Sequence, residues 1–420
     1  MKLPLKIAYD TFVQASGRLL AGLLNLAVVV LLTRQLGRST WADYVTITSY
    51  ISIFTLVADF GLNSIFVREI IENPEKRQSS FENLLSLRLG LALIAVFIAL
   101  AGLSFTSHGS AVKLGIIIGI FVVLAQSVSF STNAIFQAFR RFDYSVLADF
   151  LGNIFLLTLV GFLAIVQASV FLIIVIYLLA NLVKALVALV LVRSYVRPGL
   201  RFETNYWKSL LMISWPLGLS ALFSQITANI DKQVVALASY QPTLGQNGKD
   251  AVAIYGLAYR IFDFVISFPS FVINSVFPVL IERTKQDQHN LKNLATKIFW
   301  SVLGLGVLAL LVSYLSAGYL IPIFGNYPEA VVSFRILALS LPLFFVTSLG
   351  FGLFIILKKE KLLPLIYGFA ALFNFVANYY FVPKFGYNTA AVLTGVTELI
   401  ILLLMVVFLT TFFKSANEDN

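Results

Sequence analysis

Charged residues and cysteine are what this 420-residue chain has little of. It contains no cysteine, which excludes disulfides and thiolate metal sites. Only 12% of its residues are charged, against about 25% in soluble domains, whereas 59% are hydrophobic and the mean hydropathy is +0.90. Because no water-soluble fold can hide that much apolar surface, the composition predicts a protein embedded in a membrane.

Histidine is also scarce. The two histidines, His108 and His289, fall in predicted loops far apart in the sequence. A metal site needs several such ligands close together, so we expect no metal centre and no other cofactor. The Lys and Arg residues are scattered over many short links rather than gathered in one domain, which argues against a nucleic-acid partner.

Apolar stretches long enough to cross a bilayer as helices recur from end to end of the chain. They lack the two-residue alternation of barrel strands, and only helices or closed barrels satisfy their backbone groups in lipid. The sequence therefore predicts an all-α polytopic membrane protein with about twelve spans. We place them at residues 9–33, 42–66, 84–105, 112–137, 145–166, 169–192, 209–237, 251–280, 297–321, 330–356, 363–382 and 389–413.

The distribution of Lys and Arg predicts the orientation of these spans. With the N-terminus inside, the inside segments hold 20 basic residues. The outside links, all of them short, hold five, namely Arg34, Arg38, Lys113, Lys249 and Lys384. Cytoplasmic loops are enriched in Lys and Arg, so both termini are predicted to be cytoplasmic. The first span carries Asp10, Gln14 and Arg18 where a signal peptide would be apolar, so we expect it to stay uncleaved.

The two halves of the chain resemble each other. A shift of 211 residues aligns residues 37–66 with residues 248–277, with seven identities in thirty positions and the same predicted direction across the membrane. This pattern predicts a duplication into two six-helix bundles, residues 1–200 and 201–420. Parallel halves of this kind place a substrate cavity between them and permit alternating access, which favours a transporter.

Polar residues form stripes on several of the predicted spans. In the first span Gln14, Arg18 and Asn25 share a face, and the second and eighth spans carry stripes that include Asp59 and Asp263. Shorter stripes include Gln126, Asn133 and Gln137; Tyr177, Asn181 and Lys184; and Tyr367, Asn374 and Asn378. The alternative to a functional role is hydrogen bonding between helices, for which such residues are common in membrane bundles.

Charged residues inside spans are costly and usually face a wet cavity or a partner. Arg18 and Arg260 lie on polar stripes in the two halves, and Lys184 lies well within the sixth span. A guanidinium matches the oxygens of a phosphate, so these residues predict an anion site, with Asn25 and Gln14 beside Arg18. The alternatives are a salt bridge from Arg260 to Asp263 and extension of Arg18 to the membrane surface.

Three carboxylates inside the spans, Asp59, Asp263 and Glu398, are candidates for coupling transport to an ion gradient. Burial changes the proton affinity of a carboxyl group, so its loading can alternate with conformation. The alternative is a structural role in buried pairing.

The chain resembles, over its full length, the polysaccharide-transporter or O-antigen flippase branch of the multidrug/oligosaccharidyl-lipid/polysaccharide (MOP) exporter superfamily. The resemblance is carried by the 6+6 plan and by loosely specified segments, namely Leu32-Thr33-Arg34-Gln35-Leu36-Gly37, Tyr44, Asp59-Phe60-Gly61-Leu62 through Arg68, Ala258-Tyr259-Arg260-Ile261, Phe277-Pro278, the Arg335-to-Pro342 run and Thr397-Glu398. It implies that Arg18 and Arg260 match the cavity arginines of the first and eighth helices.

The resemblance also implies a function. Such proteins carry undecaprenyl-diphosphate-linked oligosaccharides, as for O-antigen or lipopolysaccharide, to the outer leaflet of the bacterial inner membrane. The expected partners are this lipid-linked substrate, membrane lipid and polysaccharide polymerase or assembly proteins. Two alternatives remain open. One is a cation or drug antiporter of the same superfamily, and the other is an enzyme, a membrane glycosyltransferase or polymerase acting on the same lipid-linked sugar, for which the short external links leave little room.

Overall fold

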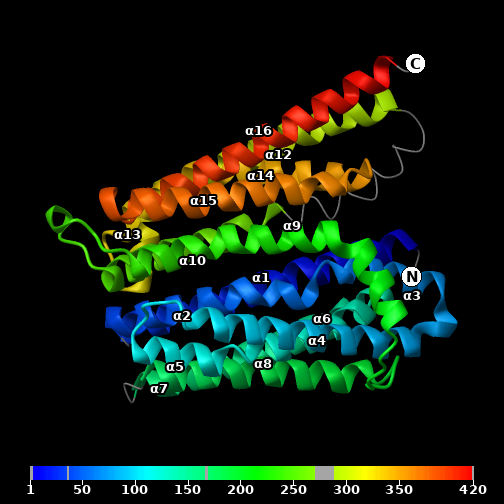
Figure 1. Cartoon of the computed structure of the whole chain (residues 1–420), viewed down its shortest axis with the longest axis horizontal. Helices are drawn as coiled ribbons and strands as arrows, with labels where there is room; N and C mark the ends of the chain where they lie inside the picture. Colours follow the sequence, from blue (N-terminus) through cyan, green and yellow to red (C-terminus); the bar gives the residue numbers. More distant parts are fainter. Residues whose placement is uncertain (1–2, 36, 166–168, 270–287, 419–420) are drawn as a thin grey trace. The chain divides into compact units, whose positions relative to one another are not determined.

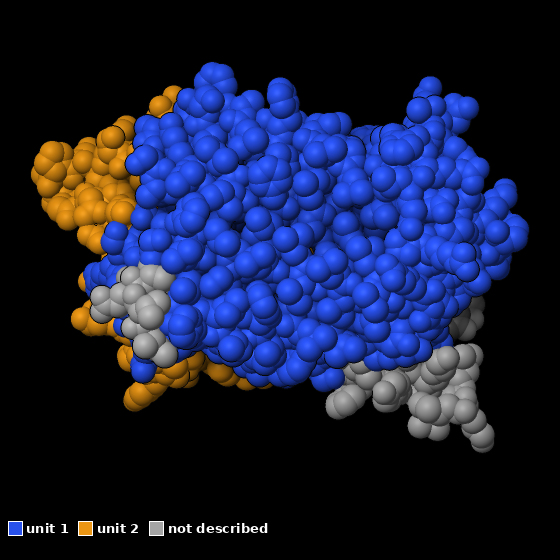
Figure 2. Space-filling model, turned by 90° about the horizontal axis from the view of Figure 1, so that it is seen from below, with its two compact units in different colours: residues 1–225 blue, residues 226–420 orange. Residues whose placement is uncertain are grey.

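The chain is represented by a computed structural model that describes residues 3–35, 37–165, 169–269 and 288–418. All regular secondary structure in these ranges is helical (Figure 1), which confirms the predicted all-α class. The described helices occupy all twelve predicted ranges, as far as residue 266 in the eighth. By contacts the chain divides into two compact units, residues 1–225 and 226–420, which are coloured separately in Figure 2.

Unit 1 consists of long helices joined by short links. They are α1 (Leu3–Gln35), α2 (Gly37–Asp59), α3 (Leu62–Glu72), η1 (Pro74–Lys76), α4 (Arg77–Leu103), α5 (Ser110–Gly119), α6 (Val122–Ala138), α7 (Phe142–Ile165), α8 (Val170–Val192) and the first part of α9 (Thr204–Leu237). Within this unit α7 packs on α1 and α8, and α6 packs on α4 and α8. The core contains Phe66, Phe81 and Phe136, which are fully buried.

Unit 2 begins within α9 and also consists of helices joined by links. Its elements are η2 (Pro242–Leu244), α10 (Gly248–Ile266), α12 (Gln288–Leu320), η3 (Ile321–Phe324), α13 (Ala330–Leu339), α14 (Leu341–Ile356), η4 (Glu360–Leu362), α15 (Leu363–Phe385) and α16 (Asn388–Glu418). In this unit α12 packs on α14, α15 on α16, and α13 on both α10 and α16. Ile298, Val302, Phe345 and Leu349 form a core cluster of the unit.

The helices are built to cross a membrane. Among the described residues, eight helices are long and apolar enough to span, and the bent pair α13–α14 makes a ninth. Large apolar side chains are exposed along them, including Phe97, Leu315 and Leu403. Exposed apolar surface of this extent is stable in contact with lipid and not in water. The helical form also suits lipid, because a helix pairs its backbone groups internally. The chain is therefore a polytopic helical membrane protein.

Among the predicted spans that the structure describes from end to end, three are interrupted. The second span breaks between α2 and α3, the fourth between α5 and α6, and the tenth bends by 43° between α13 and α14. At the first break Phe60 and Gly61 have φ angles of 42° and 67°, which end α2 and redirect the chain. A left-handed conformation costs glycine little and other residues more, so Gly61 suits this turn.

The interrupted fourth and tenth spans end alike. Basic residues with left-handed φ angles, Arg140 and Lys358, follow α6 and α14. The bundle boundary after residue 200 lies in the link before α9, and the division into two six-helix bundles at that point stays a prediction.

Candidate functional site

In unit 1, the break between α2 and α3 carries a buried ion pair. Asp59, the last residue of α2, accepts a hydrogen bond of 2.6 Å from Nη2 of Arg88 on α4. The side chain of Arg88 has no exposed surface, and its Nε and Nη1 atoms have no hydrogen-bond partner among the described residues. A buried guanidinium needs compensation by a negative charge, which Asp59 supplies. Asp59, predicted as an ion-coupling residue, therefore forms a buried ion pair, which favours the structural alternative for it.

Arg88 is the charged residue of unit 1 that the sequence analysis missed. It was counted with the basic residues that set the orientation, although it lies within the predicted third span. The sequence signal of Arg88 is a charge four residues inside an apolar stretch, and such a charge usually requires an acidic partner. The partner is 29 residues away in sequence, on another helix.

The predicted cavity residue Lys184 also has an acidic partner. Its Nζ lies 3.5 Å from Oδ1 of Asp149, which joins α8 to α7. Lys184 is mostly buried, whereas half of the Asp149 side chain is exposed. The lysine also lies against Gly152, where a side-chain Cβ would come within 2.1 Å of the Lys184 Cγ. Glycine at this position thus makes room for the lysine stem, and the Lys184 ammonium lies beside Asp149.

The other predicted residues of the first span are described in part. Asn25 is exposed, and its side-chain amide donates to the carbonyl of Ala21 at 2.9 Å within the same helix. The side chains of Gln14 and Arg18 lie outside the described residues.

Several uncharged stripes form hydrogen bonds between neighbouring helices. In unit 1 the amide of Asn63 donates to Gln137 at 2.8 Å, and the Ser145 hydroxyl donates to Asn133 at 2.7 Å. In unit 2 the Asn374 amide donates to the Thr397 hydroxyl at 3.0 Å. For these residues the bonds favour the structural alternative, because each bond joins a polar side chain to a neighbouring helix.

Unit 2 contains a compact cluster of charged and aromatic residues on α9 and α10. Asp231 is fully buried and accepts hydrogen bonds from the Tyr255 hydroxyl and from the backbone amide of Lys232. The Lys232 ammonium donates to the carbonyl of Ala228 and lies 3.4 Å from the centre of the Tyr259 ring. Its distance to Asp231 Oδ1 is 3.9 Å, so the ammonium contacts the Tyr259 ring and the Ala228 carbonyl as well as the carboxylate.

The predicted residues Arg260 and Asp263 belong to this cluster. Both are partly buried on α10, and both interact electrostatically with Lys232. Arg260 also interacts electrostatically with Asp263. The formal charges of Asp231, Lys232, Arg260 and Asp263 sum to zero, so the carboxylates and cations of the cluster compensate one another inside the membrane. The sequence analysis identified Arg260 and Asp263, but assigned no functional role to Asp231, Lys232 and the two tyrosines.

Glu398 lies on α16, where its carboxylate accepts a hydrogen bond from the Thr347 hydroxyl of α14. It is nearly buried, with 7% of its surface exposed. Within the part of the chain that the structure describes, no Lys or Arg forms an ion pair with it. Asp59, by contrast, pairs with Arg88, and Asp263 interacts electrostatically with Lys232 and Arg260.

Comparisons with known proteins agree with this architecture. The family described as "Polysaccharide biosynthesis protein" matches residues 7–284, and the family described as "MatE" matches residues 233–380. No curated protein matches the chain in sequence.

Solved structures share the fold. An inward-facing multidrug resistance MATE family transporter of the MOP superfamily has a TM-score of 0.73 at 17% identity, with 96% of this chain and 99% of that chain covered. The lipid II flippase MurJ in an inward closed conformation gives 0.72 at 16%, with 96% and 87% covered. A MOP superfamily transporter from Pyrococcus furiosus, whose structure is described as having a binding pocket of reverse polarity, gives 0.65 at 18%, with 97% and 95% covered.

Proposed function

The chain belongs to the polysaccharide biosynthesis protein family, and on that premise we propose that it is a flippase for a lipid-linked oligosaccharide. The proposed substrate is an undecaprenyl-diphosphate-linked repeat unit of O-antigen or another surface polysaccharide. It moves from the cytoplasmic to the outer leaflet of the bacterial inner membrane by alternating access. The observation that carries the proposal is the family match over residues 7–284, and the fold shared with a lipid II flippase is consistent with it.

The proposed substrate site uses basic side chains to bind the diphosphate. Arg260 in the α9–α10 cluster and Arg18 on α1 are its main members, with Lys184, Asn25 and Gln14 as further contacts. A diphosphate spreads its charge over two groups and therefore needs several donors. Because Lys184 already faces Asp149, its share of the phosphate contact depends on how far that ion pair opens.

The proposed energy source is an ion gradient, and the contacts of the candidate carboxylates support Glu398 as the coupling residue. Glu398 has a hydroxyl donor and no cationic partner among the described residues, so protonation would remove a buried charge at little cost. Asp263 interacts with Lys232 and Arg260, so its protonation would change the net charge of the α9–α10 cluster. Asp59 is held by Arg88 and is the weakest candidate.

The direct test is the sidedness of the lipid-linked saccharide in cells that lack the protein, compared with cells that carry the intact chain, Arg18→Ala or Arg260→Ala. We expect intact protein to expose the sugar outside and both variants to leave it on the cytoplasmic face. The matched control is Arg68→Ala, because Arg68 is an exposed arginine on α3 that pairs with Glu72. If the sugar reaches the outside without the protein but stays unpolymerised, the chain is an enzyme acting on it rather than a flippase.

A second candidate function is export of a cation or drug with a proton or sodium ion in exchange. It is favoured by the MatE match over residues 233–380 and by three carboxylates, Asp231, Asp263 and Glu398, on helices of unit 2. The same cells distinguish the two functions. An antiporter would change resistance to cationic drugs and leave the saccharide assay unaffected.

A further inference from the structure

Unit 1 has an apolar hollow on its surface, formed where the α2–α3 break, α4 and the beginning of α9 meet. Its volume is about 670 Å³, within the range of sites that hold small ligands. Phe60, Leu91, Trp207, Leu211, Met212 and Trp215 line it, and we call it the α9 groove. Thr204 and Lys208, both in the first turns of α9, complete the lining.

The inner wall of the α9 groove is firmly built. Phe60, Leu91, Trp207 and Leu211 pack against the core of unit 1. The indole Nε1 of Trp207 donates to the backbone carbonyl of Asn83 on α4 at 3.1 Å, which fixes the orientation of the ring. The groove therefore keeps its shape without a ligand, and little ordering is required on binding.

The segment that leads into the groove is attached to the same helix. The backbone amides of Arg201 and Glu203 donate to the side chains of Ser86 and Asn83, both at 2.9 Å. One turn later the Tyr206 hydroxyl donates to the carboxylate of Glu69 on α3, at 2.8 and 2.9 Å. These bonds hold the start of α9, and with it Lys208, in a fixed place beside the groove.

The outer edge of the groove is open to the surroundings. Met212 is 67% exposed and Trp215 is 38% exposed, and both belong to a candidate span. Side chains of this kind face lipid, so a hydrocarbon chain can enter sideways from the membrane. An opening of this kind suits a ligand that is itself part of the bilayer.

One end of the groove carries a positive charge. Lys208 is exposed, and the distribution of basic residues predicts that this end of α9 faces the cytoplasm. An ammonium on a flexible stem is a point charge that binds phosphate without fixed geometry. The groove thus combines an apolar trough with a cation at the inner membrane surface, which matches a lipid whose chain ends in phosphate.

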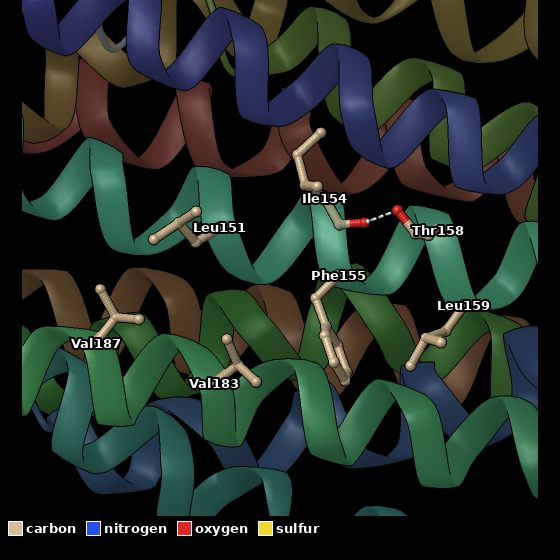
Figure 3. Close-up of a pocket in the computed structure, with 7 residues that line it drawn as sticks. All are labelled: Leu151, Ile154, Phe155, Thr158, Leu159, Val183 and Val187. Carbon is tan, nitrogen blue, oxygen red and sulfur yellow. Dashed lines mark hydrogen bonds between the residues drawn. The ribbon is translucent and has the colours of Figure 1, made fainter.

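A second hollow of unit 1 lacks this combination and serves as a control. It lies between α7 and α8, has a volume of about 430 Å³, and is lined by Leu151, Phe155, Leu159, Val183 and other apolar residues (Figure 3). Its polar member, Thr158, donates its hydroxyl to the carbonyl of Ile154 at 2.8 Å. No charged residue lines it, so it offers a lipid chain no site for a phosphate.

We propose that the α9 groove binds the polyprenyl chain of the lipid-linked substrate at the inner leaflet, with Lys208 contacting the phosphate next to that chain. This inference rests on the proposed function and adds a lateral loading site within unit 1. The substrate would first dock by its lipid, which holds the saccharide near the protein before translocation.

The test uses the full chain in nanodiscs of zwitterionic phospholipid and a polyprenyl diphosphate with a photoreactive group in its chain. Cross-linked peptides, identified by mass spectrometry, are expected to come from the α9 groove. Leu91→Trp, which fills the groove, should lower cross-linking about tenfold, whereas Val183→Trp, which fills the control hollow, should leave it unchanged. If Leu91→Trp fails to fold, Met212→Glu tests the same groove from its exposed edge without entering the core.

A charge comparison tests the role of Lys208. Lys208→Gln should weaken labelling by the diphosphate probe severalfold and leave labelling by the uncharged polyprenol unchanged, with Lys113→Gln as a neutral control. Two outcomes would overturn the proposal. In the first, phosphatidylglycerol displaces the probe as readily as polyprenyl diphosphate does, which would show a general lipid contact. In the second, the Leu91→Trp variant is labelled as strongly as the unchanged protein.

The two proposals fail in different ways. Loss of groove labelling together with normal outward movement of the sugar would refute the groove and keep the flippase. Specific groove labelling without any outward movement of the sugar would refute the flippase.

Discussion

Arg88 and Asp59 form a buried ion pair, and removal of either side chain leaves the charge of the other without compensation. The arginine has no exposed surface, and the carboxylate is 22% exposed at the end of α2. We expect Asp59→Ala to destabilise the protein by about 3–5 kcal/mol, because it leaves a buried charge without compensation. The double variant Asp59→Leu with Arg88→Met, which removes both charges, should recover most of the loss. Thermal unfolding in detergent, followed by tryptophan fluorescence, measures both effects.

The control for that pair is Asp143→Ala. Asp143 pairs with Arg141 at 2.7 Å, but both side chains are more than one third exposed, so the loss should stay within about 1 kcal/mol. Equal unfolding temperatures for Asp59→Ala and the unchanged protein would contradict the structural role of the buried pair. Asp59 would then return to the list of ion-coupling candidates.

Glu398 is the residue whose substitution tests ion coupling most directly. Glu398→Gln keeps the size of the side chain and an oxygen that can accept from Thr347, but it cannot release a proton. We expect transport to lose its dependence on the gradient and to fall at least tenfold in energised membranes, with little change in protein stability. Thr347→Val serves as control, since it removes the hydrogen bond and keeps the titratable group. Gradient-dependent transport of full strength in Glu398→Gln would remove this residue from the mechanism.

Individual residues were easier to identify than their partners. Arg260, Asp263 and Glu398 stand out in the sequence because charges are rare in apolar stretches. Their neighbours could not be deduced, since Thr347 is 51 positions from Glu398 and Tyr255 is 24 from Asp231. Such contacts depend on which helices pack together and on their rotation, and the helical period alone leaves both undetermined.

At the level of elements, the break between α2 and α3 is held by close packing against α9. A Cβ on Gly218 would lie 2.7 Å from the carbonyl oxygen of Phe60, and a Cβ on Gly61 would lie 2.9 Å from the Gly218 nitrogen. We expect Gly218→Ala to destabilise unit 1 by about 1–3 kcal/mol, because backbone atoms must move to admit the methyl group. The unfolding temperature should fall accordingly.

A second glycine of unit 1 provides the comparison. Gly90 lies inside α4, where an added Cβ would meet nothing within 4 Å. Gly90→Ala should therefore be neutral or stabilise the helix by up to about 1 kcal/mol, through its higher helix propensity. If both alanine variants unfold at the temperature of the unchanged protein, the contact between the break and α9 does not constrain the fold.

The spans themselves were predictable and their interruptions were not. Length and hydropathy located ranges in which the described residues are helical, because the bilayer imposes a minimum run of apolar residues. The break at Phe60 and Gly61 escaped notice, since the chain has 25 glycines and most of them leave their helix intact. What makes Gly61 special is its close approach to Gly218, 157 positions later, which is a property of packing and not of local sequence.

At the scale of the whole molecule, the predicted duplication has a counterpart in the interrupted fourth and tenth spans, which are both followed by a basic residue with a left-handed φ angle, Arg140 and Lys358. Among the described residues the charged contacts differ between the units. The Arg88–Asp59 pair belongs to unit 1, and the α9–α10 cluster belongs to unit 2. On the prediction of two parallel halves, we propose that the common scaffold supplies the conformational change, while the unequal charges supply substrate and ion binding.

The predicted orientation can be tested on the protein as it exists, because the chain has no cysteine and any introduced thiol is unique. With 20 basic residues on the inside segments and five outside, we expect both termini in the cytoplasm. Ser239→Cys, in the link between α9 and α10, should react almost completely with a membrane-impermeant maleimide added to intact cells. Lys361→Cys, between α14 and α15, should react only after the membrane is opened. The reverse pattern would invert the topology and place Lys208, the proposed phosphate contact, at the outer surface, where it could not load a substrate made in the cytoplasm.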